Sequence, residues 1–182
     1  TIITFIPDEK VFGNYHFITE YIDNLLWNYA FLNTGLSIYF NGQRYFAENG
    51  LFDLLTKYIN GSEIVYPIIH INEADFEVAL THSQNQYGEE YYSFVNGTHT
   101  PQGGTHQAAF REAVVKTIRE FYKKDFEASD VRSSIIAAVS IKIQEPVFES
   151  QTKTKLGSQY MEPNGHTIRK YVGDIIKKQL DD

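Results

Sequence analysis

The chain has 182 residues, no cysteine and a formal net charge of -7. This length suits one domain with a single core, and the lack of cysteine excludes disulfides, thiolate metal sites and thiol nucleophiles. The acidic balance opposes non-specific binding of nucleic acid by the whole surface, because affinity for DNA comes largely from neutralising phosphates with Lys and Arg; any DNA contact must be local.

Apolar periodicity and turn residues predict alternating strands and helices along the chain. Pro7 ends the first strand, because proline removes a hydrogen-bond donor from the ladder. Asn41-Gly42 predicts a type I′ hairpin turn, since both residues accept positive φ angles. In chain order we predict a strand at 2–6, a helix at 15–32, a hairpin of 36–40 and 43–47, a helix at 51–59, strands at 65–71, 76–82 and 90–95, a helix at 105–123, a strand at 134–143 and a helix at 167–180.

This order of elements favours an α+β two-layer sandwich, in which a mostly antiparallel sheet carries helices on one face. The run at 134–143 is apolar almost throughout, which is typical of a strand buried on both faces. The helix at 167–180 has an apolar face that needs a surface to cover it. We therefore expect one domain spanning residues 1–182. No signal-peptide pattern and no run of about 20 apolar residues occurs, so a soluble domain is expected.

A polar, lysine-bearing loop follows the apolar strand at residues 145–158, which read Glu-Pro-Val-Phe-Glu-Ser-Gln-Thr-Lys-Thr-Lys-Leu-Gly-Ser. Gln151 offers an amide donor and Lys153 an ammonium, and both groups can meet a terminal phosphate oxygen. Each charge-assisted bond of this kind is worth roughly 1.5 to 3 kcal/mol. On residue chemistry alone, however, such a loop is most often a solvated connection.

The motif Gly103-Gly104-Thr105-His106 lies directly before the predicted helix at 105–123. A helix N-terminus after two glycines can bind an anion. The structural alternative is stronger: the glycines make a tight turn, Thr105 caps the helix and His106 bonds nearby backbone.

Other catalytic and metal-binding patterns lack support. His82, His99 and His106 match no ligand spacing, so no metal site is expected. No nucleophile-elbow pattern supports a Ser-His-Asp hydrolase.

The loop at 145–158 and residues 96–110, which read Asn-Gly-Thr-His-Thr-Pro-Gln-Gly-Gly-Thr-His-Gln-Ala-Ala-Phe, resemble the second domain of the ATPase subunit of bacterial type IIA DNA topoisomerases. The resemblance spans nearly the whole chain. Residues 1–8 resemble the segment where that subunit leaves its ATP-binding domain. Residues 107–124 resemble the B subunit of topoisomerase IV more than the B subunit of gyrase. One departure is Ser133-Ser134, where many members have Glu-Gly after an Asp-Val-Arg motif.

The resemblance implies the ribosomal protein S5 domain 2-like fold with a left-handed βαβ crossover. It also implies a transducer domain, which couples ATP binding and hydrolysis in the preceding domain to DNA strand passage and a change of DNA topology. In this family the Gln and Lys that match Gln151 and Lys153 touch the ATP γ-phosphate, so Lys153 is the expected catalytic residue. Lys155 matches the family's spacing, and we expect a structural or electrostatic role for it.

The resemblance also implies the cofactor and partners. ATP with Mg²⁺ would be bound mainly by the preceding ATPase domain of the same chain. The other partners would be the A subunit of topoisomerase IV, which carries the DNA-cleaving tyrosine, and double-stranded DNA. The full-length protein would form a homodimer in the cytoplasm, and a membrane would not be among its partners.

The ends of the chain indicate a piece of a longer protein. It opens with Thr1 on a β-branched pattern, and its only methionine is Met161. We expect a monomeric fragment, inactive toward ATP, that lacks the preceding ATP-binding domain and the following metal-binding and C-terminal parts.

Three alternatives stay open. The same domain could belong to the B subunit of DNA gyrase. The chain could instead be the wall of a DNA chamber, an interaction module whose basic helix faces matter and whose loop has no nucleotide role. The basic residues in question are Lys116, Arg119, Lys123, Lys124, Arg169, Lys170, Lys177 and Lys178. An unrelated kinase on the same fold is disfavoured, because no glycine-rich phosphate loop is present.

Overall fold

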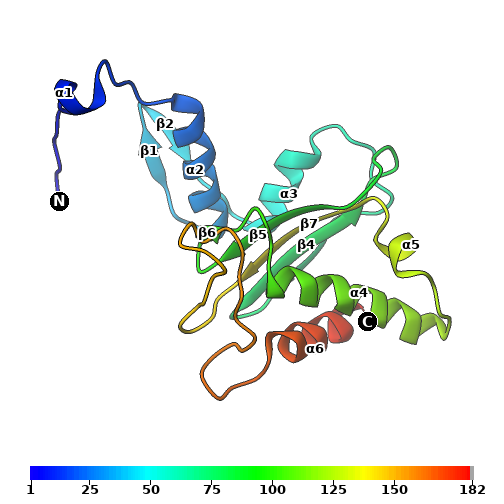
Figure 1. Cartoon of the computed structure of the whole chain (residues 1–182). Helices are drawn as coiled ribbons and strands as arrows, with labels where there is room; N and C mark the ends of the chain where they lie inside the picture. The colour runs from blue at the N-terminus through cyan, green and yellow to red at the C-terminus, as the bar shows by residue number, and fades with distance from the viewer. Residues whose placement is uncertain (181–182) are drawn as a thin grey trace.

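A five-stranded sheet forms the centre of the computed structural model, which describes residues 1–180. Neighbouring strands are antiparallel, except that β5 and β7 run parallel. The strand order is β3 (Ile69–Asn72), β4 (Phe76–His82), β7 (Ile135–Ile141), β5 (Glu90–Val95) and β6 (Thr98–His99). Figure 1 shows helices on both sides of this sheet.

The parallel strands β5 and β7 are joined by a long connection. After β6 the chain forms α4 (Thr105–Tyr122) and α5 (Ala128–Arg132) before it enters β7. This is the expected βαβ crossover. The last helix, α6 (Ile168–Leu180), lies beside α4, and both pack on the same face of the sheet (Figure 1).

The two faces of the sheet form two separate cores, because successive strand residues point to opposite faces. Val78 and Leu80 lie in the core beneath α4 and α6. Ala79, between them, lies in a second core with α3 (Leu51–Ile59). The α+β class is therefore confirmed. The expectation that helices cover one face was incomplete, since α3 has four buried residues on one side and packs them against the opposite face.

The N-terminal part of the chain forms α1 (Glu9–Phe12), α2 (Thr19–Leu32) and a two-stranded sheet of β1 (Ile38–Phe40) and β2 (Gln43–Tyr45), and the end of α2 joins the second core through Phe31. The N-terminal part otherwise extends away from the central sheet (Figure 1). The predicted hairpin is confirmed, with φ of 49° at Asn41 and 81° at Gly42.

The strand predicted at residues 2–6 was wrong. Ile2 and Ile6 are 95% and 91% exposed, and the segment pairs with no strand among residues 1–180. Its β-branched residues suit a strand, but a strand forms only where a neighbour satisfies its backbone groups.

The remaining predicted elements are confirmed, and most bounds differ by a few residues. α3, β4 and β5 have the predicted bounds, whereas α2 begins at Thr19 and β3 begins only at Ile69. Three short elements, α1, β6 and α5, were not predicted, because they are too brief to show a periodic pattern. Within residues 1–180, no helix combines the length and the apolar character that a membrane span needs.

Replacing Leu54 tests the second core. Leu54 of α3 is fully buried, so Leu54→Ala should lower the free energy of unfolding by about 2 to 5 kcal/mol, through lost apolar contact and the cavity left behind. Thr56→Ala, on the exposed side of the same helix, is the control and should change it by no more than about 0.5 kcal/mol. Urea unfolding measures both values, and equal values would contradict the packing of α3 on the sheet.

Candidate functional site

The loop at residues 145–158 is a narrow, irregular hairpin. Near its base, the N–H groups of Gly157 and Ser158 donate to the carbonyl of Val147 at 2.8 and 3.1 Å. Closer to the tip, the N–H of Glu149 donates to the carbonyl of Lys155 at 3.0 Å. These bonds hold the two arms together and leave residues 150–153 as the tip.

Gln151 and Lys153 lie on this tip and are exposed. The Lys153 N–H donates to the carbonyl of Ser150 at 3.1 Å and closes the turn. Within residues 1–180, neither side chain makes a hydrogen bond or an ion pair. Both predicted phosphate-binding groups are therefore available to a ligand from outside this part of the chain.

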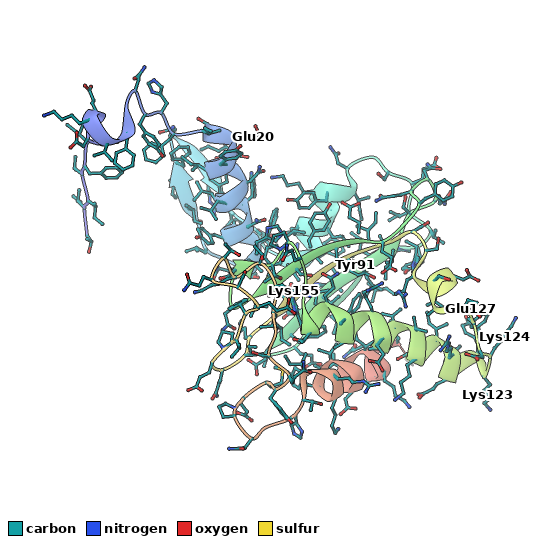
Figure 2. All side chains as sticks on the ribbon, viewed as in Figure 1. Glu20, Tyr91, Lys123, Lys124, Glu127 and Lys155 are labelled. Carbon is teal, nitrogen blue, oxygen red and sulfur yellow. The ribbon has the colours of Figure 1, made fainter. Side chains whose placement is uncertain are left out.

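Lys155 has a different environment from Lys153. Its ammonium pairs with Glu149 Oε2 at 3.1 Å, between the two arms of the loop. Figure 2 shows Lys155 where the loop meets the start of α4. This partner fits the structural or electrostatic role expected for Lys155.

The structure brings together two motifs that the sequence analysis treated separately. Leu156 is fully buried and pairs with the glycine motif: its N–H donates to the carbonyl of Gly103, and its carbonyl accepts from Thr105 N–H, both at 3.1 Å. One step earlier, the N–H of Gln102 donates to the carbonyl of Thr154 at 3.0 Å. The loop is thus seated on the residues that begin α4.

This seat explains the glycine motif without an anion. The N–H of Thr105, at the start of α4, is already bonded to Leu156, so it does not face an open anion site. The predicted capping role of Thr105 was wrong. Gly104 occupies the capping position, and no side chain caps the helix.

His106 is fully buried in the first turn of α4. Neither ring nitrogen has a hydrogen-bond partner among residues 1–180, so the predicted bond to nearby backbone was wrong. Burial lowers the pKa of the imidazole to about 4, because the charged form is poorly solvated. His106 is therefore neutral at physiological pH.

The other two histidines of the considered cluster lie on the sheet. His82 Nε2 donates to the carbonyl of Val131 at 2.9 Å, so its Nδ1 accepts from the Tyr66 hydroxyl at 2.5 Å. His99 lies on β6, and partial burial of its imidazole lowers its pKa. No group of three potential metal ligands occurs in the part of the chain that the structure describes.

A charge network ties the crossover to the sheet. Glu89, directly before β5, accepts hydrogen bonds from Arg111 of α4 at 2.7 Å and from Arg132 of α5 at 3.0 Å. Burial alone would raise the pKa of Glu89, but hydrogen bonds from Arg111, Tyr91 and Arg132 lower it to about 2. Sequence reasoning missed this network, because its members are far apart along the chain.

Comparison with known proteins identifies the family. A sequence model of the family described as DNA gyrase B matches residues 18–182. The chain belongs to the DNA gyrase B family. The B subunit of DNA topoisomerase 4 from Borreliella burgdorferi is 39% identical over 181 residues, which covers 98% of this chain and 30% of the relative. The B subunit of DNA gyrase from Helicobacter pylori strain 26695 is 34% identical over 201 residues, covering 100% of this chain and 25% of the relative.

Solved structures agree with this membership of the DNA gyrase B family. The 43K ATPase domain of Thermus thermophilus gyrase B, in complex with an aminocoumarin, has a TM-score of 0.73 and 25% identity, and covers 96% of this chain and 50% of that one. The topoisomerase IV ATP binding domain of Francisella tularensis has the same fold, with a TM-score of 0.73 at 23% identity and coverages of 96% and 50%. The chain therefore spans at most half the length of these relatives.

Ser134 has a φ of 67°, a backbone conformation that glycine favours. Its N–H donates to the carbonyl of Gly88 at 2.8 Å, and its hydroxyl donates to the carbonyl of Gln86. These bonds offset the strain that a side chain brings to this position.

The buried imidazole of His106 predicts that the fold loses stability at low pH. The pKa falls from 6.5 in the unfolded chain to about 4 in the folded one. The unfolded state therefore binds the proton more tightly than the folded state. The contribution of His106 to the free energy of unfolding is fully present above about pH 6.5, and the free energy falls by up to about 3 kcal/mol as the pH drops to about 4. Urea unfolding between pH 7.5 and 4 measures this, and His106→Leu should have a smaller slope in that window. Equal slopes for the two proteins would contradict a buried neutral imidazole.

Proposed function

We propose that this chain is the transducer domain of the B subunit of a DNA topoisomerase IV. It would couple ATP binding and hydrolysis in a preceding ATP-binding domain to DNA strand passage and a change of DNA topology. The observation that carries this proposal is the tip of the loop, where Gln151 and Lys153 have no partner among the described residues while the arms of the loop are firmly bonded.

The chemistry of the tip suits a terminal phosphate. An ammonium and an amide both donate hydrogen bonds to phosphate oxygens, and a fixed cation stabilises charge that develops during phosphoryl transfer. The seat on α4 holds the loop before the ligand arrives, so little reorganisation is needed. Lys153 is the proposed catalytic residue, and Gln151 and Lys153 together are the proposed contacts to the ATP γ-phosphate.

A contact made only when the γ-phosphate is present gives the domain its coupling role. The contacts of Gln151 and Lys153 would favour one arrangement of the two domains while ATP is bound, and they would be lost after hydrolysis. A ligand shifts a population of conformations through such a difference in contacts. The tip at residues 150–153 is not suited to hold Mg²⁺, because its ammonium repels a cation and it offers no carboxylate. We therefore assign Mg²⁺ and most ATP contacts to the preceding domain, and expect this chain alone to be inactive toward ATP.

The assignment to topoisomerase IV rests on the relatives. The identity is 39% to the B subunit of a topoisomerase 4 and 34% to the B subunit of a gyrase, over nearly the whole chain in both cases. The proposed partners are the A subunit of topoisomerase IV, double-stranded DNA and, for the full-length protein, a second copy of itself, all in the cytoplasm. The same domain of a gyrase B subunit is the nearest alternative.

The pairing of basic residues weakens the rival hypothesis of a DNA-chamber wall. Arg169 pairs with Glu112, Lys177 with Glu120 at 2.7 Å and Arg119 with Asp125 at 3.1 Å. Charges neutralised by nearby carboxylates attract phosphates weakly. Of the basic residues considered for this wall, Lys123, Lys124 and Lys178 have no ion pair among residues 1–180. Lys123 and Lys124 lie together at the far end of α4 from the loop (Figure 2), so a small part of the described surface is left for DNA.

ATP turnover by the full-length protein tests the role of Lys153. We expect Lys153→Ala to lower kcat by about 10² or more, because it removes a cation from the transferred phosphate. Lys155→Ala is the matched control: it removes an ammonium from the same loop and should leave turnover near the parent value. Thermal unfolding checks that the proteins are equally folded.

A second measurement separates phosphate contact from a general effect on the site. Lys153→Ala should weaken binding of a non-hydrolysable ATP analogue and leave ADP binding unchanged, since ADP lacks the γ-phosphate. If Lys153→Ala and Lys155→Ala both turn over ATP like the parent, the loop is a solvated connection and the chamber-wall hypothesis becomes the better one.

A further inference from the structure

Gly104 is the point where the loop comes closest to α4. A Cβ atom at this position would lie 2.5 Å from both the N and the O of Leu156, and 2.7 Å from its Cβ. These atoms belong mostly to the main chain, so no side-chain rotation can relieve the clash. The backbone of Gly104 also has a φ of 134°, which side chains rarely adopt. Any larger residue must therefore push the loop away from the helix.

The other glycine of the motif is less restrictive. A Cβ at Gly103 would meet the side-chain oxygen of Gln107 at 2.5 Å, and a long side chain can move. The requirement for close approach of the two backbones therefore falls on Gly104.

The contact at Gly104 helps to fix the position of Lys153 relative to the start of α4. Thr154, the next residue, is bonded to Gln102 twice: its carbonyl accepts from the Gln102 N–H at 3.0 Å, and its hydroxyl donates to Gln102 Oε1 at 3.1 Å. Together with Leu156, this ladder fixes the register of the loop on the start of α4. Only one peptide bond separates that ladder from Lys153.

The same hydrogen-bond ladder connects the tip to the packed helices α4 and α6. α4 has 18 residues, which corresponds to a length of about 27 Å. It packs along α6, and ion pairs from Glu112 to Arg169 and from Glu120 to Lys177 link the two helices. A displacement of the loop at Gly104 would therefore act on the end of this helix pair.

We propose that Gly104 is a positioning residue for Lys153. Its missing side chain lets the loop lie directly on the first turn of α4, so that the ammonium is held in place and movement of the tip is transmitted to α4. This inference rests on the proposed function of Lys153 at the γ-phosphate. It assigns to the glycine motif a part in ATP turnover without any contact to the nucleotide.

A double-mutant cycle in the full-length protein tests this. We expect Gly104→Ala to lower kcat by about 10-fold to 10²-fold, because a displacement of about 1 Å at a catalytic group costs this much. In a protein that already carries Lys153→Ala, the same change should cost less than about 3-fold, since there is no ammonium left to misplace. A residue that only supports the fold would lower turnover equally in both backgrounds.

Gly97→Ala is the matched control. Gly97 also has a positive φ, of 80°, but nothing lies within 4 Å of the position of its Cβ. It adds a side chain at a positive φ without the clash, and turnover should stay near the parent value. Hydrogen exchange gives a second comparison: the amides of Thr105 and Leu156 should exchange faster in Gly104→Ala and not in Gly97→Ala.

Thr154→Val covers the case in which Gly104→Ala does not fold. It removes only the hydroxyl that donates to Gln102 and should lower kcat by about 3-fold, again only when Lys153 is present. If Lys153→Ala lowers turnover but Gly104→Ala and Thr154→Val act additively with it, or not at all, the positioning role is wrong and the proposed function stands. If Lys153→Ala itself has no effect, both are wrong.

Discussion

Strand β7 joins the central sheet to the helices on both of its faces. It pairs with β4 on one side and with β5 on the other, and all but one of its residues are buried. Its alternate side chains enter the two cores: Ala137 lies beneath α4 and α6, while Ala138 lies against α3. Small residues at these two positions let helices approach both faces of one strand. The chain leaves this strand directly toward the loop, so the loop starts from a strand that is buried on both faces.

Two kinds of interaction fix the crossover helix α4. Its first turn is bonded to the loop through Thr105 and Leu156. Further along, Arg111 binds Glu89 at the edge of the sheet, and Glu112 and Glu120 pair with basic residues of α6. The ion pairs to α6 are exposed, and each contributes little to stability. Their arrangement instead fixes how α4 and α6 lie against each other, and this arrangement decides whether motion of the loop can reach both helices.

Sequence patterns predicted the elements that depend on local physics. The turn at Asn41-Gly42 and the bounds of α3, β4 and β5 follow from φ preferences and apolar periodicity within a few residues. The exposed position of Gln151 and Lys153 also agreed with the polar character of the loop. The seat of the loop could not be predicted, because the contact of Gly104 with Leu156 depends on the tertiary fold. For the same reason the sequence did not reveal the isolated imidazole of His106 or the missing partner of residues 2–6.

The backbone of Lys153 carries a further consequence. Its φ of 55° lies in the left-handed region, where residues other than glycine and asparagine lose roughly 1 to 2 kcal/mol. Asparagine at this position would fit the turn better and make the isolated fold more stable, but it would remove the ammonium. If the proposed role of Lys153 is right, the tip exchanges stability for activity, a trade-off common at functional sites. Selection for thermal stability alone would then be expected to replace the residue on which turnover depends.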